Sequence, residues 1–537
     1  MPFSSRTLQR LSRTAGMLLA AAGVLTACDA GFDGSANDNL APETELSVRS
    51  TDLTEDLGDR RLISTVRLAW SGTDPDGVVT AYEVRAYQSD AAPAPDAGWA
   101  RTTRRDSTIL LPIPFGQVTA NVAVEVRAID NDDAVDPSPA RTVFPIRNSD
   151  PELSLSRTEV PPDTTWPVLS FAFAASDPDG ELNLAAVELA LNDTLGALAR
   201  LPADATFATL VAQDPGAATT TADVFVGRGF VSSTITLPGL MLDADNVVYV
   251  RAIDQAGATS RWRAYPDPDD DDATMFVRRV TSDVLVVNDY RSQSGPTPIG
   301  EATVQVVRDA LAQQGTTDFQ EWDLSRTIQI PAAPRFSDAL PATADPTLRR
   351  TLALWDRIAW VSNSATAAAT GYNLPKAAGV LDLFFDQGGR MLVYVPITLP
   401  QGTDGGASNA AIDVLPLREL IEYPAGARAL TAQSGTPLTA APVPGTTRQL
   451  PALRTARFFY NAVLPYSVGP DDVSLYEMPF TLDTGAPWTG ARTLVSIRAD
   501  RRVALFTLPN NGAFESADGS GDGIPEAISV LLDALDF

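Results

Sequence analysis

The sequence of 537 residues contains no histidine and a single cysteine, Cys28. Without histidine the chain cannot form a Ser-His-Asp or Cys-His catalytic group, nor the common zinc and iron sites that contain imidazole. One cysteine excludes an internal disulfide and any site built from several thiolates. Asp and Glu are therefore the abundant acid–base groups that remain, and an enzyme in this chain would depend on carboxylates.

Basic side chains are also scarce, since 40 Lys and Arg oppose 67 Asp and Glu, for a net charge of −27, and Lys376 is the only lysine. Such a surface repels the phosphates of nucleic acids, and no basic patch offsets this repulsion, so we expect no nucleic-acid partner. An acidic, lysine-poor surface is typical of halophilic proteins, which work where salt screens their charges. A GC-rich genome that favours arginine codons would also explain the lysine count, and both interpretations stay open.

The first 28 residues have the pattern of a lipoprotein signal peptide. Three arginines precede an uncharged apolar stretch over 14–27, which is shorter than the roughly 20 residues that a membrane-spanning helix needs. Residues 25–28, LTAC, resemble the bacterial lipobox, and the resemblance implies cleavage after residue 27 and lipidation of Cys28. The alternative is an accidental thiol in an ordinary signal sequence. We expect a signal peptide over 1–27 and a lipid-anchored protein of the bacterial cell envelope, in the outer membrane or at the cell surface rather than in the inner membrane.

Two copies of one module follow a Gly/Asp/Asn-rich segment over 28–42, which predicts a flexible tether. The segment 66–77, VRLAWSGTDPDG, has a counterpart at 169–180, LSFAFAASDPDG, and VRAID occurs at both 126–130 and 250–254. Two landmarks in the same order indicate a duplicated domain. Apolar residues alternate with polar ones in both copies, without a long amphipathic helix, so each copy is predicted to be an all-β immunoglobulin-like sandwich.

Both copies resemble fibronectin type III modules, with Trp70 on the second strand and Val124–Ala128 on the sixth. The resemblance places the first sandwich over 43–148 and the second over 149–280, with an insertion near 200–230. The second copy lacks the tryptophan of the second strand, which leaves its subtype open.

Acidic loops are predicted at one pole of the first sandwich. Asp74 and Asp76 follow the second strand, Asp130 and Asp132 follow the sixth, and these two loops meet at the same end of such a fold. Clustered carboxylates are typical calcium ligands, so these four residues are a candidate calcium site, and calcium is the only cofactor that the sequence suggests. Asp-Pro-Asp-Gly is also favourable turn chemistry that requires no ion, and both interpretations stay open. The second copy has a poorer set, which consists of Asp177, Asp179 and Asp254.

From residue 281 the pattern changes to alternating strands and helices. Continuous apolar runs at 284–287, 358–361 and 391–395 are separated by stretches with helical spacing. Runs of this kind are typical of strands that are covered on both faces. They predict an α/β three-layer domain with a mostly parallel sheet over 281–537.

This order of elements resembles the class I glutamine amidotransferase-like fold, with Asn288-Asp289-Tyr290 at the end of the first strand and a turn over 386–390. Enzymes of that family use a cysteine nucleophile and a histidine base, which this region lacks, so the resemblance implies a non-catalytic domain. Ligands of open α/β sheets bind at the carboxyl ends of the strands. The predicted ligand crevice is therefore formed by Asn288, Asp289, Ser362 and Asn363.

These features favour a non-catalytic, lipid-anchored scaffold or binding protein of the envelope, held to the membrane by its lipid. Its two sandwiches would carry an α/β domain that binds an envelope protein, a glycan or another ligand. The alternative is a hydrolase that acts on a glycan or peptide through paired carboxylates. Fold alone does not name the ligand.

Overall fold

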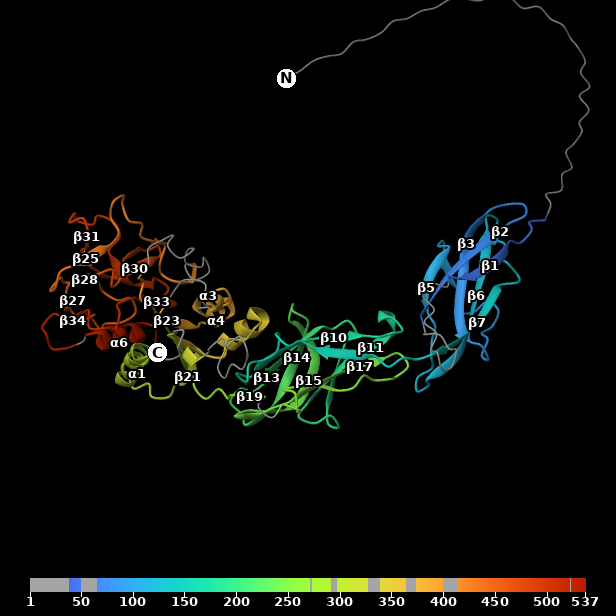
Figure 1. Cartoon of the computed structure of the whole chain (residues 1–537), viewed down its shortest axis with the longest axis horizontal. Helices are drawn as coiled ribbons and strands as arrows, with labels where there is room; N and C mark the ends of the chain where they lie inside the picture. Colours follow the sequence, from blue (N-terminus) through green and yellow to red (C-terminus); the bar gives the residue numbers. More distant parts are fainter. Residues whose placement is uncertain are drawn as a thin grey trace, which may run out of the picture.

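The computed structural model describes residues 38–49, 65–270, 273–290, 297–326, 339–363, 373–398, 413–521 and 523–537. Cys28 and the predicted signal peptide lie outside these ranges. None of the helices in the described residues has the length and apolar character needed to span a bilayer. Figure 1 shows three bodies in a row, which are the first sandwich, the second sandwich and a C-terminal domain.

In its described residues, the first sandwich consists of a three-stranded and a four-stranded sheet, both antiparallel. The smaller sheet has the order β1-β2-β5, with β1 (Glu43–Val48), β2 (Thr65–Thr73) and β5 (Asp106–Leu110). The larger has the order β4-β3-β6-β7, with β3 (Val79–Gln88), β4 (Ala100–Thr102), β6 (Thr119–Asp130) and β7 (Ala140–Arg147). Trp70 lies on β2 as predicted, and its ring packs edge-on against Tyr82 at 6.4 Å.

The second sandwich is larger. One sheet has the order β15-β14-β13-β10-β8, with β8 (Glu152–Leu155), β10 (Val168–Ser176), β13 (Phe207–Ala212), β14 (Thr219–Val226) and β15 (Val231–Met241). The other has the order β12-β11-β17-β18, with β11 (Leu184–Leu191), β12 (Leu198–Leu201), β17 (Val248–Asp254) and β18 (Arg263–Tyr265). A small third sheet contains β9 (Thr164–Thr165), β16 (Ala244–Asp245) and β19 (Phe276–Val277). The predicted insertion near 200–230 contributes β13 and β14. The strand pairing confirms two β-sandwiches.

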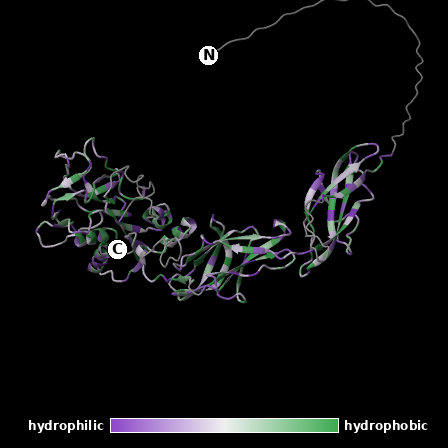
Figure 2. Cartoon of the chain, viewed as in Figure 1, coloured by the Kyte–Doolittle hydropathy of each residue, from purple (hydrophilic) through white to green (hydrophobic). Residues whose placement is uncertain are grey.

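Both sandwiches form because alternate residues of each strand face inward. In Figure 2 hydrophobic and hydrophilic residues alternate along their strands. On β6 the residues Val122, Val124 and Val126 are fully buried in the core of the first sandwich, and Val248, Val250 and Ala252 are fully buried on β17. The repeated VRAID motif thus ends a core strand in each copy.

Each sandwich also has an Arg–Glu ion pair between two neighbouring strands of one sheet, at the same position of the repeat. Arg127 on β6 pairs with Glu83 on β3 at 2.6 Å, and Arg251 on β17 pairs with Glu188 on β11 at 2.8 Å. The two pairs occupy equivalent positions in the repeat, because both arginines belong to VRAID.

A tryptophan covers the arginine in each copy. The Trp99 ring contacts two guanidinium groups, with Arg85 at 4.0 Å and Arg127 at 4.2 Å from the ring centroid. In the second sandwich Trp262 covers Arg251 at 4.4 Å. Attraction between a guanidinium group and the electron-rich face of the indole stabilises both arrangements.

The described part of the C-terminal domain contains a ten-stranded sheet. Five adjacent strands pair in parallel in the order β21-β20-β22-β23-β33, with β20 (Val284–Asp289), β21 (Gln320–Asp323), β22 (Arg357–Ser362), β23 (Arg390–Tyr394) and β33 (Val503–Phe506). The other five pair antiparallel, and they are β24 (Glu419–Leu420), β26 (Thr439–Ala440), β29 (Tyr466–Ser467), β30 (Asp472–Glu477) and β32 (Thr493–Arg498).

The prediction of a mostly parallel sheet therefore holds for only half of these strands. Parallel neighbours need long crossover connections, usually helical, whereas antiparallel neighbours need only short turns. The chain between β23 and β33 has strands and turns where it is described in 415–502, so this segment pairs antiparallel. It also forms two small sheets, one from β25 (Leu430–Ala432), β28 (Phe459–Tyr460) and β31 (Thr481–Leu482), the other from β27 (Leu453–Thr455) and β34 (Phe514–Ser516).

Helices accompany the parallel strands. The two long ones are α1 (Pro298–Gln313) and α6 (Ile524–Ala534), which contact each other. The short ones are a π-helical turn (Ala344–Leu348), α2 (Arg349–Leu352), α3 (Asn373–Ala378) and α4 (Asp382–Asp386). The stretch with helical spacing that follows the run at 284–287 forms α1, and its buried residues include Val304, Val307, Ala310 and Leu311.

Candidate functional site

The residues predicted to form a ligand crevice lie at the carboxyl edge of the parallel strands. Counted along the chain, the five parallel strands have the order 2-1-3-4-5, so the direction of winding reverses between β20 and β22. Open α/β sheets bind ligands at such a switch point. The pairing of β20 with β22 places Asp289 directly opposite Ser362, so the structure brings two of the predicted residues together at this point.

Asp289 is fully buried at this edge and is surrounded by neutral hydrogen-bond donors. Its Oδ1 accepts a hydrogen bond from Asn373 Nδ2 at 2.8 Å, and its Oδ2 accepts from Trp360 Nε1 at 3.3 Å and from Ser362 Oγ at 3.4 Å. The carboxylate thereby joins β20, β22 and α3. Sequence reasoning missed Trp360 and Asn373, because neither has a motif that marks it as a partner of Asp289.

The other predicted crevice residues have different surroundings. Asn288 is buried, accepts a hydrogen bond from the Tyr290 N–H at 3.2 Å and donates to Ser325 Oγ at 3.4 Å. Ser362 is fully buried and bonds to Asp289, whereas Asn363 follows β22 and is partly exposed. Ser362 thus contacts a carboxylate, and its hydroxyl takes part in holding the strand ends together.

The acidic pole of the first sandwich is organised by one carboxylate. Asp130 Oδ1 accepts hydrogen bonds from the N–H groups of Asp132 and Ala134, both at 2.8 Å, and Oδ2 accepts from Asn39 Nδ2 at 2.6 Å. Burial would raise the pKa of Asp130, but these hydrogen bonds hold it below its ordinary value. Asp76 Oδ2 accepts from the N–H of Leu40 at 3.0 Å.

Two of the four candidate calcium ligands, Asp76 and Asp130, are thus engaged with backbone and amide groups. Burial raises the pKa of Asp74, and the charges of Asp76 and Asp130 add to the effect. Asp74 Oδ2 is buried without a hydrogen-bond partner, while Asp132 is exposed. Within the described ranges, no group of three or more Asp, Glu, Cys or His side chains is arranged to hold a metal ion. Calcium binding stays a prediction, and so does the alternative of turn chemistry, to which the contacts of Asp130 with the N–H groups of Asp132 and Ala134 belong.

The second sandwich repeats this arrangement, which we call the polar clasp. Asp254 Oδ1 accepts from the N–H of Ala258 at 2.8 Å and Oδ2 accepts from Asn148 Nδ2, while Asp179 Oδ2 accepts from the N–H of Ser149 at 2.7 Å. The first clasp thus consists of Asn39, Leu40, Asp76 and Asp130, and the second of Asn148, Ser149, Asp179 and Asp254. Sequence reasoning missed the signal, which is the pattern N-x-x-P-E at 39–43 and again at 148–152.

The second clasp lies where the two sandwiches meet. Gly116 of the first donates its N–H to Ala256 O of the second at 2.8 Å, and Thr65 Oγ1 donates to Asp179 O. The Phe115 ring lies so close to Gly257 that an added Cβ would be 2.5 Å from it. This loop of the second sandwich therefore requires glycine, both for the contact and for its φ of +88°.

Among the residues that the structure describes, no other sandwich lies against the first clasp. The repeat aligns Ala256 and Gly257 with Asp132 and Asp133, both exposed. Charged residues at these positions suit a pole that faces solvent, as in the outer face of a terminal repeat. The same loop therefore contacts the neighbouring sandwich in the second copy and is exposed in the first.

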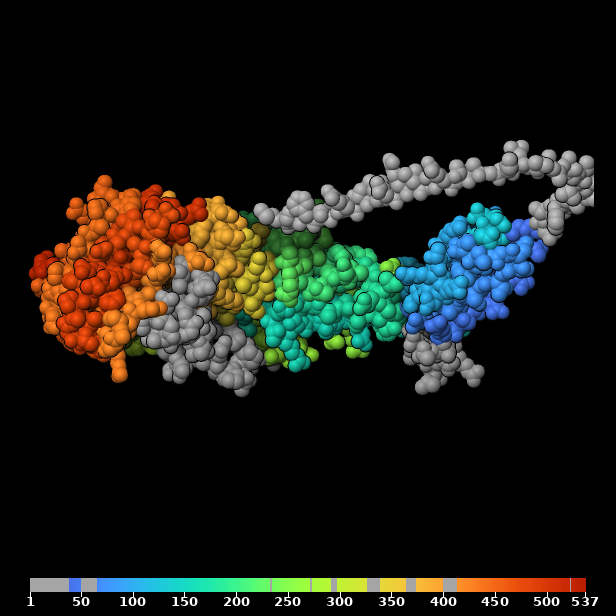
Figure 3. Space-filling model, turned by 90° about the horizontal axis from the view of Figure 1, so that it is seen from above, coloured from blue at the N-terminus to red at the C-terminus, as the bar shows by residue number. Residues whose placement is uncertain are grey.

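A second joint connects the second sandwich to the C-terminal domain. Trp166, which follows β9, is 1% exposed and packs edge-on against Trp322 at 6.0 Å and Trp355 at 4.6 Å, inside the core of the C-terminal domain. The Arg278 guanidinium lies 4.3 Å above the Trp166 ring and donates to Glu321 O at 2.7 Å. These two bodies follow one another without a gap in Figure 3.

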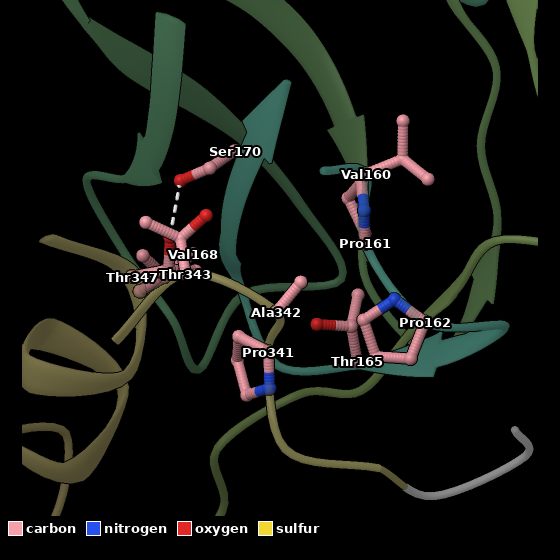
Figure 4. Close-up of a pocket in the computed structure, with 10 residues that line it drawn as sticks. All are labelled: Val160, Pro161, Pro162, Thr165, Val168, Ser170, Pro341, Ala342, Thr343 and Thr347. Carbon is pink, nitrogen blue, oxygen red and sulfur yellow. Dashed lines mark hydrogen bonds between the residues drawn. The ribbon is translucent and has the colours of Figure 1, made fainter. Parts of the chain in front are cut away.

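Polar contacts support the same joint, as Figure 4 shows. Ser170 Oγ and Thr347 Oγ1 form a buried hydrogen bond across it, beside a cavity of about 10 Å³. That volume admits about one water molecule, so the cavity is no site for an organic ligand. The only lysine, Lys376, donates to the carbonyl oxygens of Pro341 and Ala342, which line this cavity, and burial lowers its pKa.

No protein-family model matches the chain, and no curated protein matches it. Similar solved structures include the fibronectin(III)-like modules of Clostridium thermocellum CbhA, at 13% identity and a TM-score of 0.16, over 44% of this chain and 94% of that one. The FN1-FN3 domains of chicken CNTN1 show 11% identity and a TM-score of 0.16, over 45% and 67% of the two chains. The central fibronectin-III array of RIM-binding protein shows 12% identity and a TM-score of 0.14, over 46% and 72%. At TM-scores this low, the assignment of two β-sandwiches rests on the strand pairing given above.

Proposed function

We propose that this chain is a lipid-anchored, non-catalytic protein of the bacterial cell envelope, whose two β-sandwiches form a stiff spacer for a ligand-binding C-terminal domain. The observation that carries the proposal is the Trp166 joint, where the second sandwich inserts a buried side chain into the core of the C-terminal domain. Domains joined by a small polar interface move relative to each other by default, whereas a buried apolar contact limits such motion.

The joint between the sandwiches supports the same proposal. The linker residue Asn148 is itself buried and bonded to the second sandwich, and backbone atoms of Gly116 and Ala256 are paired across the joint. A linker fixed in this way does not act as a flexible tether. Both joints therefore favour an extended and stiff arrangement of the three bodies, as drawn in Figure 1.

For the C-terminal domain we infer an α/β fold of the glutamine amidotransferase-like kind that has lost its catalytic groups. The parallel order 2-1-3-4-5 and the polar residues at the switch point support this inference. The domain contains no cysteine or histidine, and the Ser362 hydroxyl bonds to the buried carboxylate of Asp289. We therefore assign ligand binding to the switch point, at Asn288, Asp289, Ser362 and Asn363.

The anchor is tested with Cys28→Ser in the native host. Without the thiol the lipid cannot be attached, so we expect the variant in the soluble fraction or retained as an uncleaved precursor, while the wild type partitions with membranes. Separate fractionation of inner and outer membranes tests the expected location. A variant that is cleaved and still partitions with membranes would show that another feature holds the protein there.

A further inference from the structure

The loop between β33 and β34 contains the only Asn-Gly pair of the sequence, Asn511-Gly512, and both residues are exposed. Because β33 is parallel to β23, this loop begins at the carboxyl edge of the parallel strands. Asn510 Nδ2 donates to Ala302 O of α1 at 3.1 Å, which fixes one side of the loop. The Asn-Gly pair itself remains open to solvent.

The side chain of Asn511 bends back over the peptide group that follows it. Its Oδ1 accepts a hydrogen bond from the N–H of Ala513 at 3.1 Å, and the ring that this bond closes contains both Asn511 Cγ and Gly512 N. Among the residues that the structure describes, neither the N–H of Gly512 nor Asn511 Nδ2 donates a hydrogen bond. One turn therefore holds an amide carbon together with a backbone nitrogen that is not engaged elsewhere.

The residue types favour a reaction between these two atoms. Gly512 has a φ of +70° and no side chain to shield its nitrogen, and its surroundings are open. If this nitrogen attacked Asn511 Cγ, negative charge would develop on Oδ1, to which the N–H of Ala513 already donates. A donor placed at such an oxygen stabilises the intermediate. The loop thus provides a nucleophile, an electrophilic carbon and a donor for the developing charge.

We propose that Asn511 is a site of spontaneous modification, at which attack by the backbone nitrogen of Gly512 converts the side-chain amide into a carboxylate. Gly512 N loses its proton and bonds to Cγ, the bond from Cγ to Nδ2 breaks, and ammonia leaves behind a cyclic imide. Water then opens the imide. Cleavage of the bond between Gly512 N and Cγ gives aspartate, whereas cleavage of the bond between Gly512 N and the main-chain carbonyl carbon of Asn511 gives isoaspartate. Water is the only co-reactant.

Each conversion adds one negative charge to this loop. Arg457 Nη2 donates to Asn511 O at 3.0 Å, so the new carboxylate forms near a guanidinium group, which binds a carboxylate more strongly than a neutral amide. The isoaspartate product also lengthens the main chain by one carbon at the carbonyl that Arg457 contacts. This inference goes beyond the proposed function and depends on neither the lipid anchor nor the stiffness of the joints.

The test is mass spectrometry of the purified full chain after incubation at neutral and at mildly alkaline pH. Digestion with pepsin, in acid where the reaction is slow, keeps further modification from arising during sample preparation. We expect the peptide that contains Asn511 to gain the mass of one amide-to-acid conversion, as both aspartate and isoaspartate. The conversion should be faster at the higher pH, because the nitrogen of Gly512 must lose its proton. Asn510 lies in the same loop and is the internal control, which should stay unmodified.

Two variants test the mechanism. Gly512→Ala places a methyl group beside the attacking nitrogen and should slow the conversion about tenfold, which corresponds to a barrier higher by about 1.4 kcal/mol. Asn511→Gln lengthens the side chain by one carbon, which disfavours ring closure, and should stay unmodified. Circular dichroism verifies that each variant is folded, and the comparison of Asn511 with Asn510 in the wild type requires no variant.

An Asn511 that stays intact in the folded chain would overturn the proposal, and its conversion in urea would then show that the fold protects this loop. Equal conversion of Asn510 and Asn511 would also overturn it, because the reaction would not depend on glycine. Aspartate without isoaspartate would indicate direct hydrolysis of the amide and would contradict attack by Gly512. None of these outcomes affects membrane fractionation, so failure here would leave the anchored-spacer function standing.

Discussion

Asn148 donates a hydrogen bond from its side-chain amide to Oδ2 of Asp254, a carboxylate that is 1% exposed at the joint between the two sandwiches. Asn39 makes the same contact with Asp130 at 2.6 Å, at the equivalent pole of the first sandwich. The same Asn–Asp hydrogen bond of the repeat is therefore buried at the joint in one copy and lies at a more exposed pole in the other. Its contribution to stability should be larger at the joint, because there the asparagine is buried as well.

Asn148→Ala should lower the free energy of unfolding of the second sandwich by about 1 to 3 kcal/mol, since it leaves a buried carboxylate with one donor fewer. Urea denaturation of the full chain measures this free energy of unfolding, with each domain followed as a separate transition. Asn39→Ala is the matched control, and because Asn39 is exposed we expect a smaller loss, confined to the first sandwich. An unchanged transition in the Asn148 variant would contradict a stabilising role for the clasp.

Stability of the second sandwich should fall as the pH rises from about 4 to about 6. Burial raises the pKa of Asp177 from 3.8 to about 6, with the charges of Asp179 and Asp254 adding to it. The folded state therefore keeps a proton that the unfolded state has lost, so this stabilisation is complete below pH 3.8 and disappears as the pH passes 6. Its size is about 1 to 3 kcal/mol.

Thermal unfolding between pH 4 and pH 7 measures this effect, and the comparison with Asp177→Asn isolates it from other carboxylates. The variant mimics the protonated group and should show a flatter pH profile. Parallel profiles for wild type and variant would mean that Asp177 is not the group that titrates in this window.

Trp166→Ala should destabilise the C-terminal domain by about 3 to 5 kcal/mol, because it removes a large side chain from a core that belongs to another domain. It should also loosen the joint. Small-angle X-ray scattering should then show a broader distribution of molecular dimensions than for the wild type. Trp166→Phe keeps a ring at this position and should show a smaller change in both measurements, whereas identical scattering for Trp166→Ala and wild type would argue against a stiff spacer.

Trp99→Ala should destabilise the first sandwich by about 1 to 2 kcal/mol, since its ring contacts two guanidinium groups at 4.0 and 4.2 Å. Trp262→Ala removes only one such contact and should cost the second sandwich about half as much. Chemical denaturation at low and high salt gives both values. Equal losses would indicate that burial of the ring, and not its cation contacts, provides the stabilisation.

Some of these features follow from sequence alone. The duplication is visible in VRAID and Asp-Pro-Asp-Gly, and the period-two pattern around them predicts strands, because local periodicity decides which faces are buried. The apolar face of α1 follows for the same reason. Even the approach of Asp289 to Ser362 could be expected, since both end buried strands of one parallel sheet.

Other features depend on contacts between residues far apart in sequence, for which no local pattern exists. Asn39 meets Asp130 across 91 positions and Asn148 meets Asp254 across 106, and only the folded sandwich brings these ends together. Trp166 lies in the core of the next domain, where the rings of Trp322 and Trp355 pack edge-on against it, and only the tertiary structure brings these three rings together. The antiparallel half of the C-terminal sheet also depends on tertiary structure, because its short strands find partners that the sequence pattern does not specify.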